Sequence, residues 1–210
     1  MLNVSLQFSL LCVLNLSFNN LLFVAALMAS QRKGSSESAP SDFGFLKQFH
    51  HLPKLVVFDL DFTLWPFHVD KLKPPLRPLK DGNSVDSELT LISLYPEVKD
   101  ILQSMSKHFL LAVASRVEDI TVAYQLLSFC QISSYFPLKE IYPTSKSIHL
   151  KRLQARSGHH AHEMLFFDDD KRNIRDSKNI GVQAVQVLNG LSWHVVIDGL
   201  SLFSQSQSSI

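Results

Sequence analysis

Cysteine is scarce in this sequence, and no excess of charge of one sign is present. The only cysteines are Cys12 and Cys130, and the first lies in a segment that looks separate from the fold, so no disulfide framework is expected. A reducing compartment fits this composition better. The formal net charge at pH 7 is +1, and no arginine-rich run or basic stripe with interleaved aromatic residues occurs, which argues against a nucleic-acid partner.

Charged side chains are missing from the first part of the chain, where no Asp, Glu, Lys or Arg precedes Arg32. Residues 1–29 form a hydrophobic extension, but they lack the basic start of a signal peptide, and a membrane-spanning helix would carry several asparagines near its middle. A third interpretation is that synthesis begins at Met28, which makes the upstream stretch a gene-model artefact or a weak organelle signal. All three interpretations stay open, so organelle or membrane targeting is left undecided for residues 1–29, and the cytoplasm is the predicted location.

The rest of the chain is long enough for one domain with a real core. Residues 30–51 are expected to form a flexible linker, because residues 30–43 are rich in Ser with Gly and Pro and lack apolar periodicity. The predicted domain covers residues 52–203, and residues 204–210 form a tail. We expect a monomer.

Short apolar runs alternate with stretches of helical periodicity along this body. The first run is continuous and ends in acidic residues, as in a central strand buried on both faces. The runs are Leu55–Phe58, residues 109–113, a shorter piece that ends at Ile141, residues 164–167 and residues 182–187. Strands that alternate with helices imply parallel pairing and right-handed crossovers. We therefore predict an α/β fold, a doubly wound (Rossmann-like) parallel sheet with helices on both faces.

Polar residues follow the predicted strands at the edge where such sheets bind ligands. They are Asp59, Asp61, Ser115, Lys146, Asp168 and Asp169. Asp59 and Asp61 are two residues apart in extended backbone, so both carboxylates point to the same side. Carboxylates crowded in this way repel each other unless a cation joins them, and a hard ion with oxygen ligands, Mg²⁺, is expected. Asp168 and Asp169 would complete its oxygen ligands.

Each of these residues has an ordinary structural explanation when it is taken alone. Asp168, Asp169 and Asp170 would serve as an N-cap with acids at the positive end of the helix dipole. Ser115 would be another cap, and Lys146 a solvated helix residue. The functional interpretation depends on four separate segments that deliver polar groups to one edge of the sheet.

The same residues resemble the ordered motifs of the haloacid dehalogenase superfamily, with FDLDFT at 58–63, Ser115, Lys146 and FFDD at 166–169. More narrowly, FDLDFTLWPF, ASR at 114–116, EIYPTSK at 140–146 and FFDDDKRNI at 166–174 resemble the eukaryotic magnesium-dependent phosphatase-1 family. The resemblance covers about residues 52–200. It implies a magnesium-dependent phosphomonoester hydrolase that works through an aspartyl-phosphate intermediate.

The resemblance also implies a role for each motif residue. Asp59 would be the nucleophile and Asp61 the general acid and base. The phosphoryl group would be held by Ser115, Lys146 and the backbone amides of Leu60 and Arg116, while Thr63 would steady the loop. Mg²⁺ would bind to Asp59, the backbone carbonyl of Asp61 and Asp169, with Asp168 behind these ligands.

Other classes of protein share parts of this pattern. Dehalogenases of the superfamily need no acid two residues after the nucleophile, so Asp61 favours phosphate chemistry. A receiver module also combines acids, a hydroxyl and a lysine, but its acid pair precedes the phosphorylated Asp, whereas Asp168 and Asp169 come last here. A phosphate-binding pseudoenzyme remains an open alternative.

A cap insertion is predicted at about residues 65–95, after the first strand. It is small enough to be a short flap or hairpin, and it contains Trp65, Phe67, His68, the bases Lys71, Lys73, Arg77 and Lys80, and the turn signal Asp81-Gly82-Asn83. The aromatic residues either pack over the core or contact substrate, and the bases are either functional or a solvated face. An open site would admit phosphoproteins bearing phosphotyrosine, or sugar phosphates such as phosphorylated fructosamines, both implied by the resemblance. The sequence does not choose between them.

Overall fold

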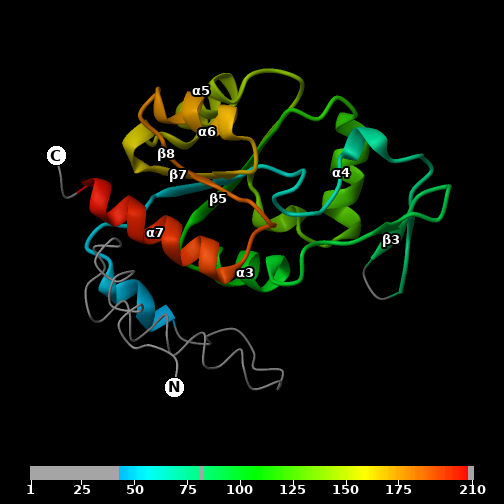
Figure 1. Ribbon diagram of the computed structural model, residues 1–210, viewed down its shortest axis with the longest axis horizontal. Helices are drawn as coiled ribbons and strands as arrows, with labels where there is room; N and C mark the ends of the chain where they lie inside the picture. The colour runs from blue at the N-terminus through cyan, green and yellow to red at the C-terminus, as the bar shows by residue number, and fades with distance from the viewer. Residues whose placement is uncertain (1–42, 81–82, 208–210) are drawn as a thin grey trace, which may run out of the picture. The chain divides into compact units, whose positions relative to one another are not determined.

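A parallel sheet of five strands in the order β6-β5-β1-β7-β8 organises the computed structural model, which describes residues 43–80 and 83–207 (Figure 1). The strands are β1 (Leu55–Phe58), β5 (Leu110–Ser115), β6 (Leu138–Ile141), β7 (Met164–Asp168) and β8 (Gln183–Gln186). After β1 the chain builds outward through β5 and β6, and it then crosses to the other side of β1 for β7 and β8. The strand order therefore reverses beside β1, which is where ligands bind in such sheets. The predicted fold class is confirmed.

The central strand is apolar throughout because both of its faces are covered. All four residues of β1 are buried, and the strand pairs in parallel with β5 on one side and β7 on the other. Its last residue, Phe58, lies opposite Val113 of β5 and Phe167 of β7. Any side chain that follows Phe58 therefore emerges at the middle of the carboxyl edge of the sheet.

Helices pack on both faces of this sheet. On one face, α5 (Lys146–Ser157) and α6 (Lys171–Lys178) bury a core cluster that includes Val57, Ala114 and Phe166. Helices α3 (Val98–Met105) and α7 (Trp193–Gln207) lie on the opposite side of the strands in Figure 1. Helix α7 approaches so closely that a Cβ atom at Gly199 would lie 2.7 Å from Phe167 Cζ. Helix α4 (Ile120–Phe129) follows β5.

The insertion after β1 forms a small flap, as predicted. It contains the 3-10 helix η2 (Val69–Lys71) and an antiparallel sheet of β2 (Arg77–Pro78), β3 (Ser84–Val85) and β4 (Leu91–Ile92). The buried Asp86 carboxylate accepts hydrogen bonds from the backbone amides of Lys73, Glu88 and Thr90 at 3.2, 3.0 and 2.8 Å. One acidic side chain therefore organises the flap loops. Residues 81 and 82 of the predicted turn lie outside the described residues.

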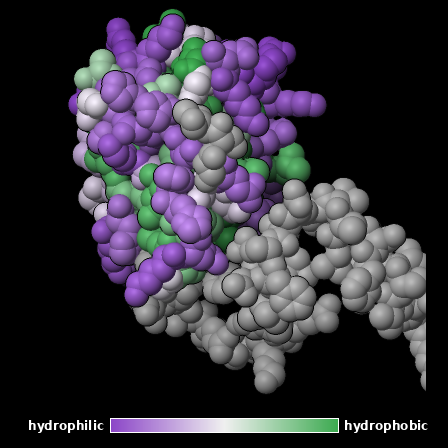
Figure 2. Space-filling model, turned by 90° about the vertical axis from the view of Figure 1, so that its left-hand side faces the viewer, coloured by the Kyte–Doolittle hydropathy of each residue, from purple (hydrophilic) through white to green (hydrophobic). Residues whose placement is uncertain are grey.

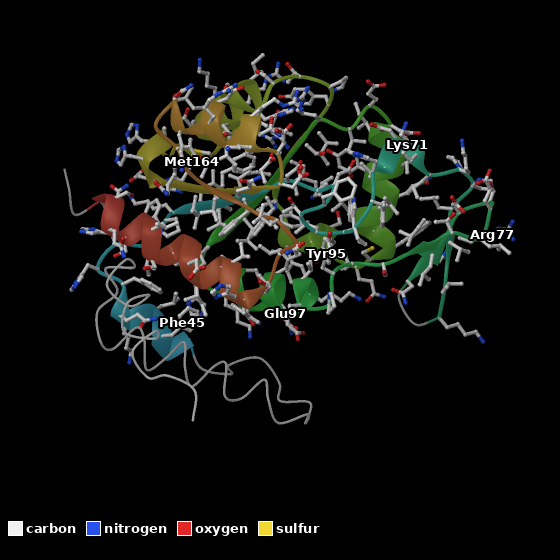
Figure 3. All side chains as sticks on the ribbon, viewed as in Figure 1. Phe45, Lys71, Arg77, Tyr95, Glu97 and Met164 are labelled. Atoms are coloured by element: carbon white, nitrogen blue, oxygen red, sulfur yellow. The ribbon has the colours of Figure 1, made fainter. Side chains whose placement is uncertain are left out.

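The flap stands at the carboxyl end of the sheet. Figure 3 labels Lys71 and Arg77 in the flap, and it places Met164, the first residue of β7, at the other end of the molecule. Figure 2 shows a face on which hydrophilic side chains predominate, with smaller hydrophobic areas between them, as is usual for globular domains.

The ends of the folded unit differ from the predicted ones. A 3-10 helix spans Phe43–Gln48, inside the stretch expected to be a linker, because Phe45 and Leu46 are apolar and buried. The rings of Phe45 and Trp193 meet edge to face at a centroid distance of 6.5 Å. At the other end, α7 continues to Gln207 through the predicted start of the tail. The hydrophobic extension lies outside the described residues, and within 43–80 and 83–207 no helix has the length and apolar character to span a membrane.

Candidate active site

A cavity of about 300 Å³ opens at the carboxyl ends of the central strands. It is lined by most of the predicted site residues, which are Asp59, Asp61, Ser115, Arg116, Lys146 and Asp169. Asp59 directly follows β1, Ser115 ends β5 and Lys146 begins α5, so parallel strands deliver these residues to one edge. Residues that are far apart in the chain thus meet in one cavity.

Lys146 lies at the centre of this group with its side chain almost completely buried. Its ammonium group donates hydrogen bonds to Asp59 Oδ1 and to the carbonyl oxygen of Ala114, and it lies 3.3 Å from Asp168 Oδ2. A buried ammonium is stable only when charges and acceptors surround it in this way. The structure therefore rules out the alternative of Lys146 as a solvated helix residue.

The Asp59 carboxyl has an unusual electrostatic environment. Burial raises the pKa of Asp59 to about 7 although Lys146 opposes the shift, and the negative charge of Asp168 adds to it. Burial also raises the pKa of Asp169, with Asp168 as the next cause. The carboxyl groups of Asp59, Asp168 and Asp169 are therefore crowded around a single ammonium group, that of Lys146. Such an excess of acidic groups favours a bound cation.

The acidic residues also fit a metal ion by their geometry. Asp59, Asp168 and Asp169 each place one carboxylate oxygen within 4.8 Å of the others. Such an all-oxygen set suits Mg²⁺. The Asp168 carboxylate is fully buried and accepts hydrogen bonds from Asn173 Nδ2 at 3.0 Å to each oxygen and from the Asp170 amide at 2.8 Å. Asp169 is only partly buried and lines the cavity, so it is the more accessible of the two.

Asp61 also lines the cavity, but it does not belong to this cluster of three carboxylates. Its Oδ1 accepts a hydrogen bond from Trp65 Nε1 at 2.9 Å, and its Oδ2 accepts one from the Val69 amide at 3.1 Å. His68 Nδ1 lies 3.2 Å from the same Oδ2. Burial raises the pKa of Asp61, although these contacts oppose the shift. A carboxyl group with a raised pKa is suited to donate a proton.

Leu60 and Thr63 do not line the cavity with their side chains. Both side chains are buried. Leu60 was predicted to contact phosphate through its backbone amide, whereas Thr63 was predicted to steady the loop. The Thr63 hydroxyl has no hydrogen-bond partner among the residues that the structure describes. The loop is instead held by backbone bonds, from the Thr63 amide to the Leu60 carbonyl at 3.2 Å and from the Leu191 amide to the Thr63 carbonyl at 2.9 Å.

Several cavity residues were not singled out by the sequence. Phe62 has a φ of 54°, a left-handed conformation that is uncommon for an aromatic residue and often found at functional sites. Asp70 accepts hydrogen bonds from the amides of Glu118 and Asp119 at 3.1 and 3.0 Å, which ties the flap to the loop after β5. Asn173 holds Asp168. Phe62 and Asn173 had a sequence signal, because they belong to the FDLDFT and FFDDDKRNI motifs, whereas Asp70 had none.

The acidic cluster, buried lysine and serine at the carboxyl edge of a doubly wound sheet agree with a phosphatase of the haloacid dehalogenase type, and the comparisons with known proteins identify that class. The chain belongs to the acid phosphatase family, whose model matches residues 51–206. It is 42% identical to human magnesium-dependent phosphatase 1 over 159 residues, which are 75% of this chain and 90% of the relative. It is 33% identical to a HAD-like hydrolase superfamily protein of Schizosaccharomyces pombe, with 69% and 91% of the two chains covered. The predicted family resemblance is confirmed.

Solved structures support the same fold. A predicted phosphatase from Clostridium acetobutylicum aligns with a TM-score of 0.53 at 13% identity, over 76% of this chain and all of the other. A HAD-superfamily hydrolase from Geobacter sulfurreducens aligns with a TM-score of 0.51 at 15% identity, over 70% and 98% of the two chains. At these identities the likeness concerns the fold alone.

Proposed function

We propose that this protein is a Mg²⁺-dependent phosphomonoester hydrolase that works through an aspartyl phosphate on Asp59. The observation that carries the proposal is the convergence of Asp59, Asp169, Ser115 and Lys146 on one cavity at the edge of the sheet. Membership of the acid phosphatase family supports the reaction class. The names of the human relative and of a Saccharomyces cerevisiae relative, a putative magnesium-dependent phosphatase, support the choice of cation.

In the first half of the reaction, a carboxylate oxygen of Asp59 attacks the phosphorus atom. The bond from phosphorus to the leaving-group oxygen breaks, and that oxygen takes a proton from the Asp61 carboxyl. In the second half, water attacks the phosphorus atom while Asp61 accepts the proton of that water. The bond between phosphorus and Asp59 then breaks, and inorganic phosphate leaves.

The remaining residues hold the phosphoryl group. Lys146 offsets its negative charge, Ser115 donates a hydrogen bond, and the backbone amides of Leu60 and Arg116 contact its oxygens. The carboxylates of Asp59 and Asp169 and the backbone carbonyl of Asp61 would hold Mg²⁺, with Asp168 behind them. When bound, the ion would neutralise phosphate charge, which the crowded carboxylates otherwise repel.

The substrate is proposed to be a phosphorylated small molecule or a phosphoprotein. The flap is small, with strands of only two residues each, and a small flap is compatible with a phosphate on a protein surface as well as with a compact metabolite. Protein phosphotyrosine and sugar phosphates such as fructosamine phosphates are the two classes to test first. A panel of phosphopeptides and phosphorylated sugars separates them.

Trapping the intermediate tests the reaction itself. The parent protein and the Asp59→Asn variant are mixed with substrate and Mg²⁺, quenched rapidly in acid and mapped by peptide mass spectrometry. We expect phosphate on the peptide that contains Asp59 in the parent, and neither phosphoenzyme nor turnover in the variant. Phosphate on Ser115 or His68, or an active Asp59→Asn variant, would overturn the proposal.

A further inference from the structure

His68 stands at the mouth of the cavity and contacts the carboxylate proposed to transfer protons. Its side chain is 59% exposed, and its Nδ1 lies 3.2 Å from Asp61 Oδ2. The ring also meets the Phe62 ring edge to face, at a centroid distance of 4.6 Å and an interplanar angle of 86°. The imidazole is therefore oriented from two sides although much of it faces solvent.

The two oxygens of Asp61 are engaged unequally. Within the described residues, Oδ1 accepts one hydrogen bond, from Trp65 Nε1, whereas Oδ2 accepts from the Val69 amide and faces His68 Nδ1. When Asp61 is ionised, its carboxylate only accepts hydrogen bonds, so in that state Nδ1 of His68 carries the hydrogen in this contact. A carboxylate oxygen has about two acceptor sites. Oδ2 is thus filled by protein donors, and Oδ1 keeps one site for a proton.

Two of the three donors to Asp61, Trp65 Nε1 on Oδ1 and the Val69 amide on Oδ2, come from buried residues. Trp65 is completely buried, and its ring stacks on Phe67 at 5.7 Å with an interplanar angle of 4°. The Val69 amide belongs to η2, whose Val69 side chain is also buried. His68 is the exposed member of the three donors, so the orientation of Asp61 is open to change at that position.

We propose that His68 is a positioning residue, which together with the Val69 amide occupies Oδ2 of Asp61 so that Oδ1 carries the proton to the leaving group. The inference rests on the proposed role of Asp61 as general acid and base. His68 acts through Asp61, and its contribution is to keep the proton-bearing oxygen in one orientation. A substrate whose leaving group needs protonation depends on this orientation, whereas one with a good leaving group does not.

An exposed histidine beside a carboxylate is often energetically unimportant, and the chain contains a matched example. His194 and Asp198 on α7 lie 3.4 Å apart through Nε2 and Oδ2, with side-chain exposures of 58% and 52%. The two histidines are equally exposed, but the Asp61 side chain is only 14% exposed. The His68 bond therefore acts on a largely buried carboxylate, and His194 supplies the control.

The test compares kcat/KM for an alkyl phosphate, glycerol 2-phosphate, and for an aryl phosphate, p-nitrophenyl phosphate, at saturating Mg²⁺. His68→Phe keeps a ring against Phe62 and removes the hydrogen bond, while His68→Asn keeps an N–H donor near the position of Nδ1. We expect His68→Phe to lower kcat/KM for the alkyl phosphate by about tenfold, a loss typical of a hydrogen bond to a charged group. The aryl phosphate should lose less than about threefold, because its leaving group needs little protonation. His68→Asn should recover most of the alkyl activity, and His194→Phe should alter neither rate.

Equal losses on both substrates in His68→Phe, or full activity on the alkyl phosphate, would overturn the positioning role. Thermal unfolding of each variant identifies a loss caused by misfolding, and His68→Leu then replaces His68→Phe in the comparison. The Asp61→Asn variant tests the proposed role of Asp61 separately from that of His68. If that variant loses alkyl activity by about 10²–10⁴, the role of Asp61 holds and the His68 result stands on its own. If it keeps alkyl activity, the proposed function fails.

Discussion

Replacing Asn173 by leucine should weaken Mg²⁺ binding without removing any proposed ligand or nucleophile. The Asn173 side chain is buried, and its Nδ2 donates to both oxygens of Asp168 at 3.0 Å. Leucine has a similar size but no donor, so the substitution takes these hydrogen bonds away and leaves little cavity. Among the described residues, the Asp168 carboxylate would then keep only the Asp170 amide and Lys146 as partners, and a turn of this carboxylate toward Asp59 and Asp169 would disturb the metal site.

The magnitude follows from the strength of the lost bonds. A hydrogen bond to a charged group contributes about 1.5–3 kcal/mol, and about 1.4 kcal/mol corresponds to a tenfold change in an equilibrium constant. The Mg²⁺ dissociation constant should therefore rise by about 10- to 100-fold, which is also the usual range for residues that support metal ligands. Because Asp59, Lys146 and Ser115 are unchanged, kcat at saturating Mg²⁺ should fall far less.

The assay is the Mg²⁺ dependence of turnover, accompanied by calorimetric titration of Mg²⁺ into the metal-free protein. Asn179→Leu is the matched control, since Asn179 lies on the exposed C-cap of the same helix. Thermal unfolding confirms that both variants are folded. An unchanged Mg²⁺ dissociation constant in a folded Asn173→Leu variant would refute the argument that Asp168 must be held for the metal to bind.

Three further predictions follow from the site and from the ends of the fold. Excess chelator should abolish turnover, and added Mg²⁺ should restore it; full activity with metal analysis confirming an empty site would exclude the proposed mechanism. A chain that starts at Gly44 should keep its turnover, whereas one that starts at Leu52 loses the buried Phe45 side chain and about 1.5–3 kcal/mol of stability, measured by denaturant unfolding. The metal-free protein should lose stability as pH rises from about 4 to 7, because the folded-state pKa of Asp59 is raised to about 7 and the folded state therefore binds more protons than the unfolded state in this range. Mg²⁺ should thus raise the melting temperature more at pH 8 than at pH 5, and an equal rise at both values would contradict the assigned pKa.

The predicted strands match the structure closely at the centre of the sheet and less well at the ends of the fold. The run Leu55–Phe58 coincides with β1, because a strand buried on both faces leaves an unbroken apolar signal. Helix α5 begins at Lys146 and is capped by Gly158 with a φ of 74°, a left-handed conformation that glycine adopts readily. The short helix at Phe43–Gln48 was not predicted, because its two buried residues follow a Ser-rich stretch and show no periodicity.

In the site, the positions of the motif residues were predictable from the sequence, but their hydrogen-bond partners were not. The placement of Asp59, Ser115, Lys146 and Asp169 at one edge follows from strand ends and motif order alone. The partners of Asp61 were not foreseen, because Trp65, His68 and Val69 reach it through the particular path of the flap. The Thr63 hydroxyl was expected to steady the loop, but its surroundings leave it without a partner in the described part of the chain.

By itself, the sequence determined the class of fold and the order of the motifs, because apolar runs and helical periodicity are local patterns, and their alternation along the chain implies parallel pairing. Only the tertiary structure decided which carboxylate oxygens are already occupied by protein donors. The two oxygens of Asp168 are held by Asn173, and Oδ2 of Asp61 by Val69 and His68. Such pairings depend on the distances between packed segments, which residue spacing does not encode.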